Sequence, residues 1–167
     1  MKSIQKKFAP FLTLAFLAGC TTVGHPYPFP KDSEPSAQLQ IQGKAVYLLT
    51  LNEKGCYTGK TYVDGSPGAM PVKVVPDRPL VISYEENVCM LPASFTPQKD
   101  GRYRLVAWEG HKPADADMSF FQSMMHVHDR QCVVDVVEVD SEGEPMKPVK
   151  VKELRPSQTA ITCIKFR

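Results

Sequence analysis

Patterns that usually mark a hydrolytic active site are missing from this chain. No Gly-x-Ser-x-Gly stretch occurs, so no serine is presented in the way that a nucleophilic hydrolase requires. Two carboxylate pairs, Glu85/Glu86 and Asp115/Asp117, are the obvious candidates for cutting a glycan. Neighbouring residues of a strand point to opposite faces, so Glu85 and Glu86 cannot converge, and Asp115/Asp117 fall in an irregular region. We therefore expect neither an enzyme nor a bound cofactor.

Closely spaced cysteine pairs are also lacking. A four-thiolate zinc site usually contains pairs of cysteines separated by only a few residues. The last four cysteines of this chain are each roughly thirty or more residues from the next. The spacing therefore argues against a structural zinc site.

Helical periodicity is scarce, and the apolar residues repeat instead with a period of two. A short helix is conceivable only at residues 117–125, whereas turn residues separate many short alternating runs. We expect strands near residues 38–42, 46–51, 61–63, 72–75, 80–84, 89–95, 103–108, 132–139, 147–154 and 160–166. Some of these pieces are short enough to merge, so the pattern predicts an all-β fold, a single β-sandwich (immunoglobulin-like or transthyretin-like) of about seven to nine strands.

Three details of this pattern can be checked in a structure. Cys89 shares its parity with the apolar residues of its strand and should point inward. The turn at residues 96–101 should join its two flanking strands as a hairpin. Trp108 could form an exposed aromatic patch with Tyr103 and Tyr47, although a lone tryptophan in such a hairpin more often belongs to the core.

The N-terminus contains an apolar run of a particular kind. Three lysines precede the apolar residues 8–17, and the run ends in Leu17-Ala18-Gly19-Cys20. A basic start, a short apolar segment and small residues at its end are the parts of a secretory signal, and the run is too short for a permanent membrane span. With the cysteine directly after the small pair, this stretch resembles the lipobox of bacterial lipoproteins.

The resemblance implies that residues 1–19 are a signal peptide that is removed, and that Cys20 becomes an acylated N-terminus. Two or three acyl chains hold a protein at a membrane almost permanently. Residue 21 is Thr and not the Asp that usually retains such proteins at the inner membrane of enteric-type bacteria. The resemblance therefore implies a lipid-anchored protein of the outer membrane that faces the periplasm. No specific domain family is recognised in the remaining sequence.

A large excess of charge is absent as well. Loss of the three lysines of the signal peptide changes the formal net charge from +2 to −1. A basic excess is what drives non-specific binding to nucleic acid, and none remains in the mature chain. We therefore exclude a nucleic-acid partner.

Residues 20–36 differ in composition from the rest of the chain. Prolines at positions 26, 28, 30 and 35 prevent a helix or a central strand and favour an extended path. At about 3.1 Å per residue, such a segment reaches on the order of 50 Å. We expect a tether at residues 20–36 that holds a single domain, residues 37–167, clear of the lipid.

Export would place Cys56, Cys89, Cys132 and Cys163 in an oxidising compartment. Four cysteines in a small exported domain most often form two disulfides, and three pairings are possible. The sequence does not decide among them. The shortest loops favour Cys56–Cys89 and Cys132–Cys163.

His126 and His128 form the centre of an alternative hypothesis. If they lie in a strand, they share one face about 7 Å apart, and several methionines are close in sequence. Imidazole and thioether ligands suit copper, and imidazole also suits zinc. The main expectation is a non-catalytic binding or structural module with a protein or envelope partner, such as an immunity or inhibitor protein for a periplasmic effector. The alternative is an exported copper or zinc protein.

The lipobox predicts a specific modification at Cys20. Mass spectrometry of the protein purified from membranes should find a chain that starts at Cys20 and carries acyl groups. A Cys20→Ser variant should keep residues 1–19 and incorporate no labelled palmitate, because the thiol that accepts the lipid is gone. An intact leader or an unmodified sulfur in the wild-type protein contradicts this prediction.

Overall fold

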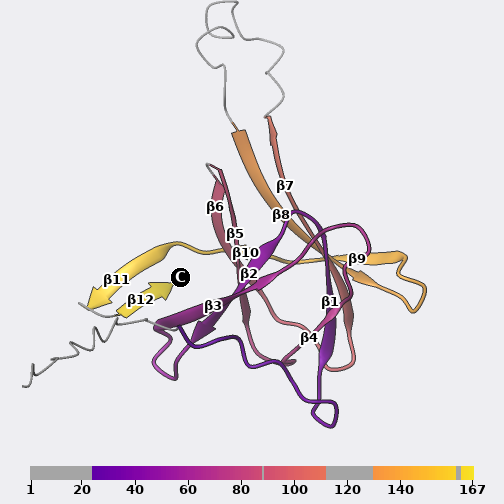
Figure 1. Ribbon diagram of the computed structural model, residues 1–167, viewed down its shortest axis with the longest axis horizontal. Coiled ribbons are helices and arrows are strands. Elements are labelled where there is room, and N and C mark those ends of the chain that lie inside the picture. Colours follow the sequence, from indigo (N-terminus) through magenta and orange to yellow (C-terminus); the bar gives the residue numbers. More distant parts are fainter. Residues whose placement is uncertain (1–23, 88, 112–129, 161–162) are drawn as a thin grey trace, which may run out of the picture.

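The computed structural model describes residues 24–87, 89–111, 130–160 and 163–167 (Figure 1). These residues form twelve β-strands and no helix. The predicted all-β class is therefore confirmed, and the strands outnumber the seven to nine expected. No helix of the described residues is long and apolar enough to cross a membrane.

Two five-stranded sheets form the body of the domain. The first sheet has the order β4 (Val72–Val74), β1 (Ala37–Gly43), β7 (Arg102–His111), β8 (Arg130–Val139) and β9 (Pro145–Val149). The second has the order β10 (Lys152–Glu153), β6 (Cys89–Phe95), β5 (Leu80–Glu86), β2 (Val46–Leu51) and β3 (Tyr57–Val63). In these two sheets β1 and β7 are parallel and the other paired strands are antiparallel.

One hydrophobic core joins the two sheets. Leu39 and Leu105 from the first sheet and Leu48 and Ile82 from the second are completely buried in it. Burial of each such side chain stabilises the fold by about 1.5–3 kcal/mol. Cys89 is also buried in this core, as its parity predicted.

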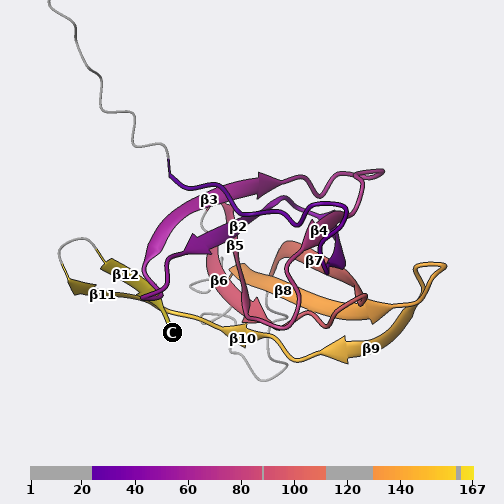
Figure 2. The ribbon, with the colours of Figure 1, turned by 90° about the horizontal axis from the view of Figure 1, so that it is seen from below.

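A second, smaller cluster lies on the other face of the second sheet. Leu49 of β2 and Val81 of β5 are buried there together with Leu154, and Tyr57 and Phe166 pack against them. Phe166 belongs to a C-terminal two-stranded sheet of β11 (Pro156–Ala160) and β12 (Cys163–Phe166). Figure 2 shows this hairpin on the side of β2 and β5 that is away from β7 and β8. The central strands are therefore covered on both faces.

Three of the expected elements differ from the structure. The alternating run 147–154 is not one strand, because the chain leaves the first sheet after β9 and joins the second at β10. The turn at 96–101 does not close a hairpin, since β6 and β7 belong to different sheets. The final run contains a hairpin, with β11 preceding the expected strand. Alternation of apolar residues predicts which face of a strand is buried, but it does not predict which sheet the strand joins.

The proline-rich segment packs against the domain over residues 24–36 and does not stand away from it. The His25 amide donates to the Thr58 carbonyl over 3.0 Å. Tyr27 is buried in the main core, and its hydroxyl accepts a hydrogen bond of 3.0 Å from the Val75 amide. Further along, Asp32 pairs with Lys73 at 2.6 Å. The path is extended, as the prolines predict, but the segment covers the edge of β3.

The structure forms two disulfides, Cys56–Cys163 and Cys89–Cys132. Two bridges were expected, but the pairing favoured by the shortest loops is wrong. The register that pairs Tyr47 with Ser83 makes β2 and β5 antiparallel. Cys56, just beyond β2, and Cys89, just beyond β5, therefore lie at opposite ends of the second sheet and cannot meet.

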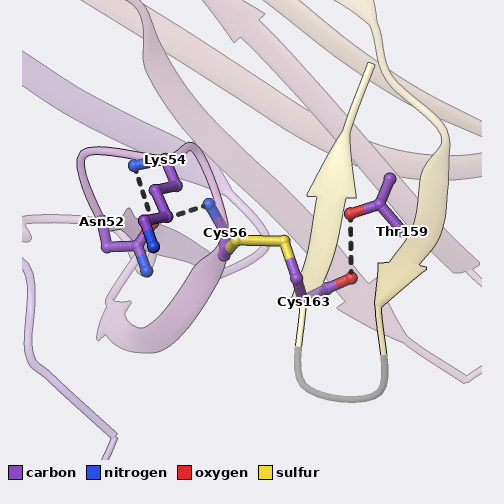
Figure 3. Close-up of a disulfide and its surroundings, with 5 residues drawn as sticks. All are labelled: Asn52, Lys54, Cys56, Thr159 and Cys163. Carbon is purple, nitrogen blue, oxygen red and sulfur yellow. Dashed lines mark hydrogen bonds between the residues drawn. A yellow bond between two sulfur atoms is a disulfide. The ribbon is translucent and has the colours of Figure 1, made fainter.

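Each disulfide fastens a part of the fold with few other attachments. Cys89–Cys132 links β6 of one sheet to β8 of the other, and Cys56–Cys163 links the start of β3 to the C-terminal hairpin (Figure 3). The bridged residues are 43 and 107 positions apart. Closing loops of these sizes in the unfolded chain corresponds to about 4 and 5 kcal/mol in the chain-entropy model.

Loss of the Cys56–Cys163 bridge should release the C-terminal hairpin. A Cys56→Ser/Cys163→Ser variant should lose about 3–5 kcal/mol of unfolding free energy and bind more of a hydrophobic dye, because Leu49 and Val81 lose their cover. Thr159→Ala is the matched control, since it removes only a 3.5 Å hydrogen bond to the Cys163 carbonyl in the same hairpin. Denaturant unfolding with dye binding measures both effects. Equal stability of the wild type and the double variant contradicts the prediction.

Candidate partner-binding face

β7 and β8 pair over a longer stretch than either strand pairs with its other neighbour. Their register runs from Tyr103 opposite Glu138 to His111 opposite Arg130. β1 accompanies β7 only as far as Ala107, and β9 accompanies β8 only from Val136 onward. We call residues 108–111 and 130–135 the hairpin extension. Among the described residues, no third strand pairs with it, and Figure 1 shows it rising from the body of the domain.

The Cys89–Cys132 bridge attaches this extension to the second sheet. An isolated two-stranded ribbon is only marginally stable in water. Cys132 lies directly opposite Glu109 in the extension, and its sulfur is bonded to Cys89 at the start of β6. The bridge therefore holds the extension in place where strand pairing with neighbours has ended.

Trp108 is the aromatic side chain of the extension. Alternation along β7 places Tyr103, Leu105 and Ala107 in the core and Trp108 on the outer face, where 43% of it is exposed. The expectation that Trp108 belongs to the core is therefore wrong. Tyr103 is buried and Tyr47 is half-buried against Tyr62, so the three aromatic residues form no common patch.

Gly110 gives Trp108 its place on the strand. A Cβ atom added to Gly110 would lie 1.8 Å from the Cζ3 atom of the Trp108 ring. The indole therefore lies across the bare backbone of Gly110, two residues further along the same face. Val133 is directly opposite Trp108 on β8 and is half-buried. The outer face of the extension thus presents a flat apolar surface of a ring beside an aliphatic side chain.

A hollow of about 340 Å³ lies between β8, β6 and the chain that connects β9 to β10. Most of its lining residues are aliphatic, but the surface exposed to the hollow is more polar than apolar and includes two carboxylates, Asp135 and Glu153. The lining residues are Leu91, Ala93, Cys132, Val133, Val134, Asp135, Val149, Val151 and Glu153. The hollow follows the part of β8 that β9 leaves unpaired, so a groove with a mixed polar and aliphatic lining accompanies this strand edge.

A polar cluster lies near the base of the extension. The Lys44 ammonium contacts Glu86 at 2.7 Å, and the buried Tyr84 hydroxyl donates to the same carboxylate over 3.2 Å. The hydrogen bond from Lys44 lowers the pKa of Glu86, whereas burial raises the pKa of Tyr84 to about 12. Glu86 is therefore ionised and Tyr84 neutral at neutral pH. The Lys44 amide also donates to the Ala107 carbonyl over 3.0 Å, so the cluster ties the second sheet to β7.

The carboxylate pair Glu85/Glu86 behaves as its spacing predicts. Glu85 pairs with Lys60 and Glu86 pairs with Lys44, so the two carboxylates have separate partners and do not converge. The hydrogen bond that the Lys60 ammonium donates to Glu85 raises the pKa of Lys60. Asp115 and Asp117 lie outside the described residues.

His126 and His128 also lie outside the described residues. Within the part of the chain that the structure describes, no group of three or more His, Cys, Asp or Glu side chains is arranged to hold a metal ion. The four cysteines of this part are bonded in pairs. Cys20 precedes the first described residue.

Comparison of the chain with protein-family models, curated proteins and solved structures finds no match.

Sequence reasoning did not find the open edge or the groove beside it. Both arise because β8 is ten residues long and β9, its neighbour, only five. Because the expected strands at 132–139 and 147–154 were of equal length, the sequence did not predict that β8 extends beyond β9. The sequence did contain one signal for the position of Trp108, namely a glycine, Gly110, on the same face of the strand two residues later.

The position of Trp108 predicts a spectroscopic effect at Gly110. Because Trp108 is the only tryptophan in the chain, its fluorescence reports on this face alone. A Gly110→Val substitution should displace the ring into solvent, shift its emission to longer wavelength and increase quenching by acrylamide. Tyr62→Ala, on β3, should leave the spectrum unchanged. If Gly110→Val has the wild-type spectrum, the ring does not lie over residue 110.

Proposed function

We propose that this chain is a lipid-anchored β-sandwich of the bacterial outer membrane, facing the periplasm, that binds a protein partner and catalyses no reaction. The anchor follows from the lipobox at Cys20. The sandwich is supported by two sheets that enclose one core and by two disulfides. Its partner is an effector that the protein neutralises, as an immunity or inhibitor protein would, or a component of the envelope.

The observation that carries the binding role is the exposed Trp108 beside a strand edge that pairs with no other described strand. Tryptophan is enriched among the residues that contribute most to protein interfaces. An open edge can accept an extended segment of a partner through main-chain hydrogen bonds, while neighbouring pockets receive its side chains. The hairpin extension offers the tryptophan, the edge and the groove within a few residues of one another.

The outermost strands of the two sheets support this reading because their edges are blunted. β9 contains Pro145 and Pro148, and proline cannot donate to a neighbouring strand. β4 and β10 have only three and two residues. The edge of β3 is covered by residues 24–27. Natural proteins usually protect such edges against unwanted pairing, so the edge of β8 at residues 130–135, which no other described strand covers, is best explained by a partner.

The proposal predicts that Trp108 is needed for capture of the partner. With a photoreactive phenylalanine analogue at Val133, one protein of the envelope extract should be cross-linked and should co-purify in stoichiometric amount. Trp108→Ala should weaken its binding by about 2 kcal/mol, roughly thirtyfold, because an interface tryptophan is lost. Tyr62→Ala is the control, since Tyr62 is 59% exposed on β3 and lies outside the proposed face.

Equal capture by Trp108→Ala and Tyr62→Ala would place the interface elsewhere and sink this assignment. The metal content of the same purified protein tests the alternative. Stoichiometric copper or zinc that disappears in a His126→Ala/His128→Ala variant, without a protein partner, would replace the binding role with metal binding.

A further inference from the structure

The N-terminal segment is fixed to the domain at its first described residues. A Cβ atom on Gly59 would lie 2.3 Å from the His25 carbonyl oxygen, so the two backbones are in direct contact. The Tyr27 amide donates to the Thr61 hydroxyl over 2.7 Å, and the Tyr27 ring is buried. Gly24 therefore lies at a defined point on the surface beside β3.

The chain from this point to the lipid is short. This step rests on the proposed function, because it requires the lipid at Cys20. Residues 21–23 alone separate Cys20 from Gly24. At no more than about 3.6 Å per residue, the two positions are within about 14 Å of each other. The lipid headgroups are therefore close to the surface around Gly24, and a reach of 50 Å is not possible.

Two elements lie at this end of the molecule. The β2–β3 turn and the β11–β12 hairpin are joined there by the Cys56–Cys163 bridge. Both ribbon views place β11–β12 and the start of the described chain toward one end of the long axis, and the β8–β9 turn at the opposite end (Figures 1 and 2).

Two elements at opposite ends of this axis differ in charge. Residues 154–160 and 163–167 contain Arg155, Lys165 and Arg167 and no acidic residue. The β8–β9 turn at the far end contains Asp140, Glu142 and Glu144 and no basic residue. The contrast is between these two elements and not between the whole ends of the molecule, because Glu53 lies in the β2–β3 turn and Lys147 and Lys150 lie beside the acidic turn.

We propose that the β11–β12 hairpin is a membrane-contact surface that binds the anionic headgroups of the bilayer in which Cys20 is anchored. Each basic residue near an anionic membrane strengthens association by about fivefold. Ile164, 43% exposed on the face of β12 opposite to Lys165, supplies an apolar side chain for the interfacial region. The domain is thus held against the membrane in one orientation, with the acidic β8–β9 turn directed into the periplasm.

The test uses the full lipidated protein in vesicles of phosphatidylethanolamine and phosphatidylglycerol. A photoreactive residue at Ile164 should cross-link to lipid, whereas one at Met146, 64% exposed on β9, should not. Arg155→Glu/Lys165→Glu should reduce the lipid cross-link from position 164 severalfold. Lys147→Glu/Lys150→Glu is the matched reversal at the other end and should leave it unchanged. High salt, or phosphatidylcholine in place of phosphatidylglycerol, should also reduce the lipid cross-link from position 164, because either change weakens the attraction between the basic residues and the membrane.

The outcomes separate this inference from the lipid anchor itself. If the protein floats with the vesicles but cross-links to lipid equally from positions 164 and 146, the domain has no fixed orientation and this inference fails alone. A cross-link from position 164 to protein in place of lipid also overturns it. If the protein does not float with the vesicles, the anchor fails and the inference fails with it.

Discussion

Burial of the inward faces of two sheets in one core is the constraint on which the rest of this structure depends. Leu48 and Ile82 can leave water only by packing against Leu39 and Leu105. Once this packing is made, every second residue of each strand points away from the core and must find another environment. Leu49 and Val81 find it under the C-terminal hairpin, whereas Trp108 on the outer face is 43% exposed.

The disulfides and the edges follow from the same packing. Paired strands of equal length stabilise each other through their backbone hydrogen bonds. β8, however, continues beyond β9, and among the described residues the C-terminal hairpin pairs with neither five-stranded sheet. Each of these two parts carries one bridge to the second sheet. The segment at residues 24–36 covers another exposed place, the edge of β3. The proposed partner would cover the edge of β8, and the proposed membrane contact would use the C-terminal hairpin.

Several expectations that depend only on the alternation of neighbouring residues were met, whereas those that depend on which distant segments meet were not. The apolar run at β2, the inward direction of Cys89 and the separation of Glu85 from Glu86 all follow from the two-residue repeat of a strand. The disulfide pairing was wrong because loop length says nothing about which ends of a sheet two cysteines occupy. The tether was misjudged because proline predicts an extended path but not the buried site that receives Tyr27.

The sequence by itself determined the all-β class, the number of bridging cysteines and the lipobox pattern, because each is a local pattern of residue types. Only the tertiary structure decided that Cys56 meets Cys163, that Trp108 is exposed over Gly110, and that the basic C-terminal hairpin and the acidic β8–β9 turn lie at opposite ends. These are relations between segments far apart in the chain. They depend on strand order and register, which strand periodicity does not encode.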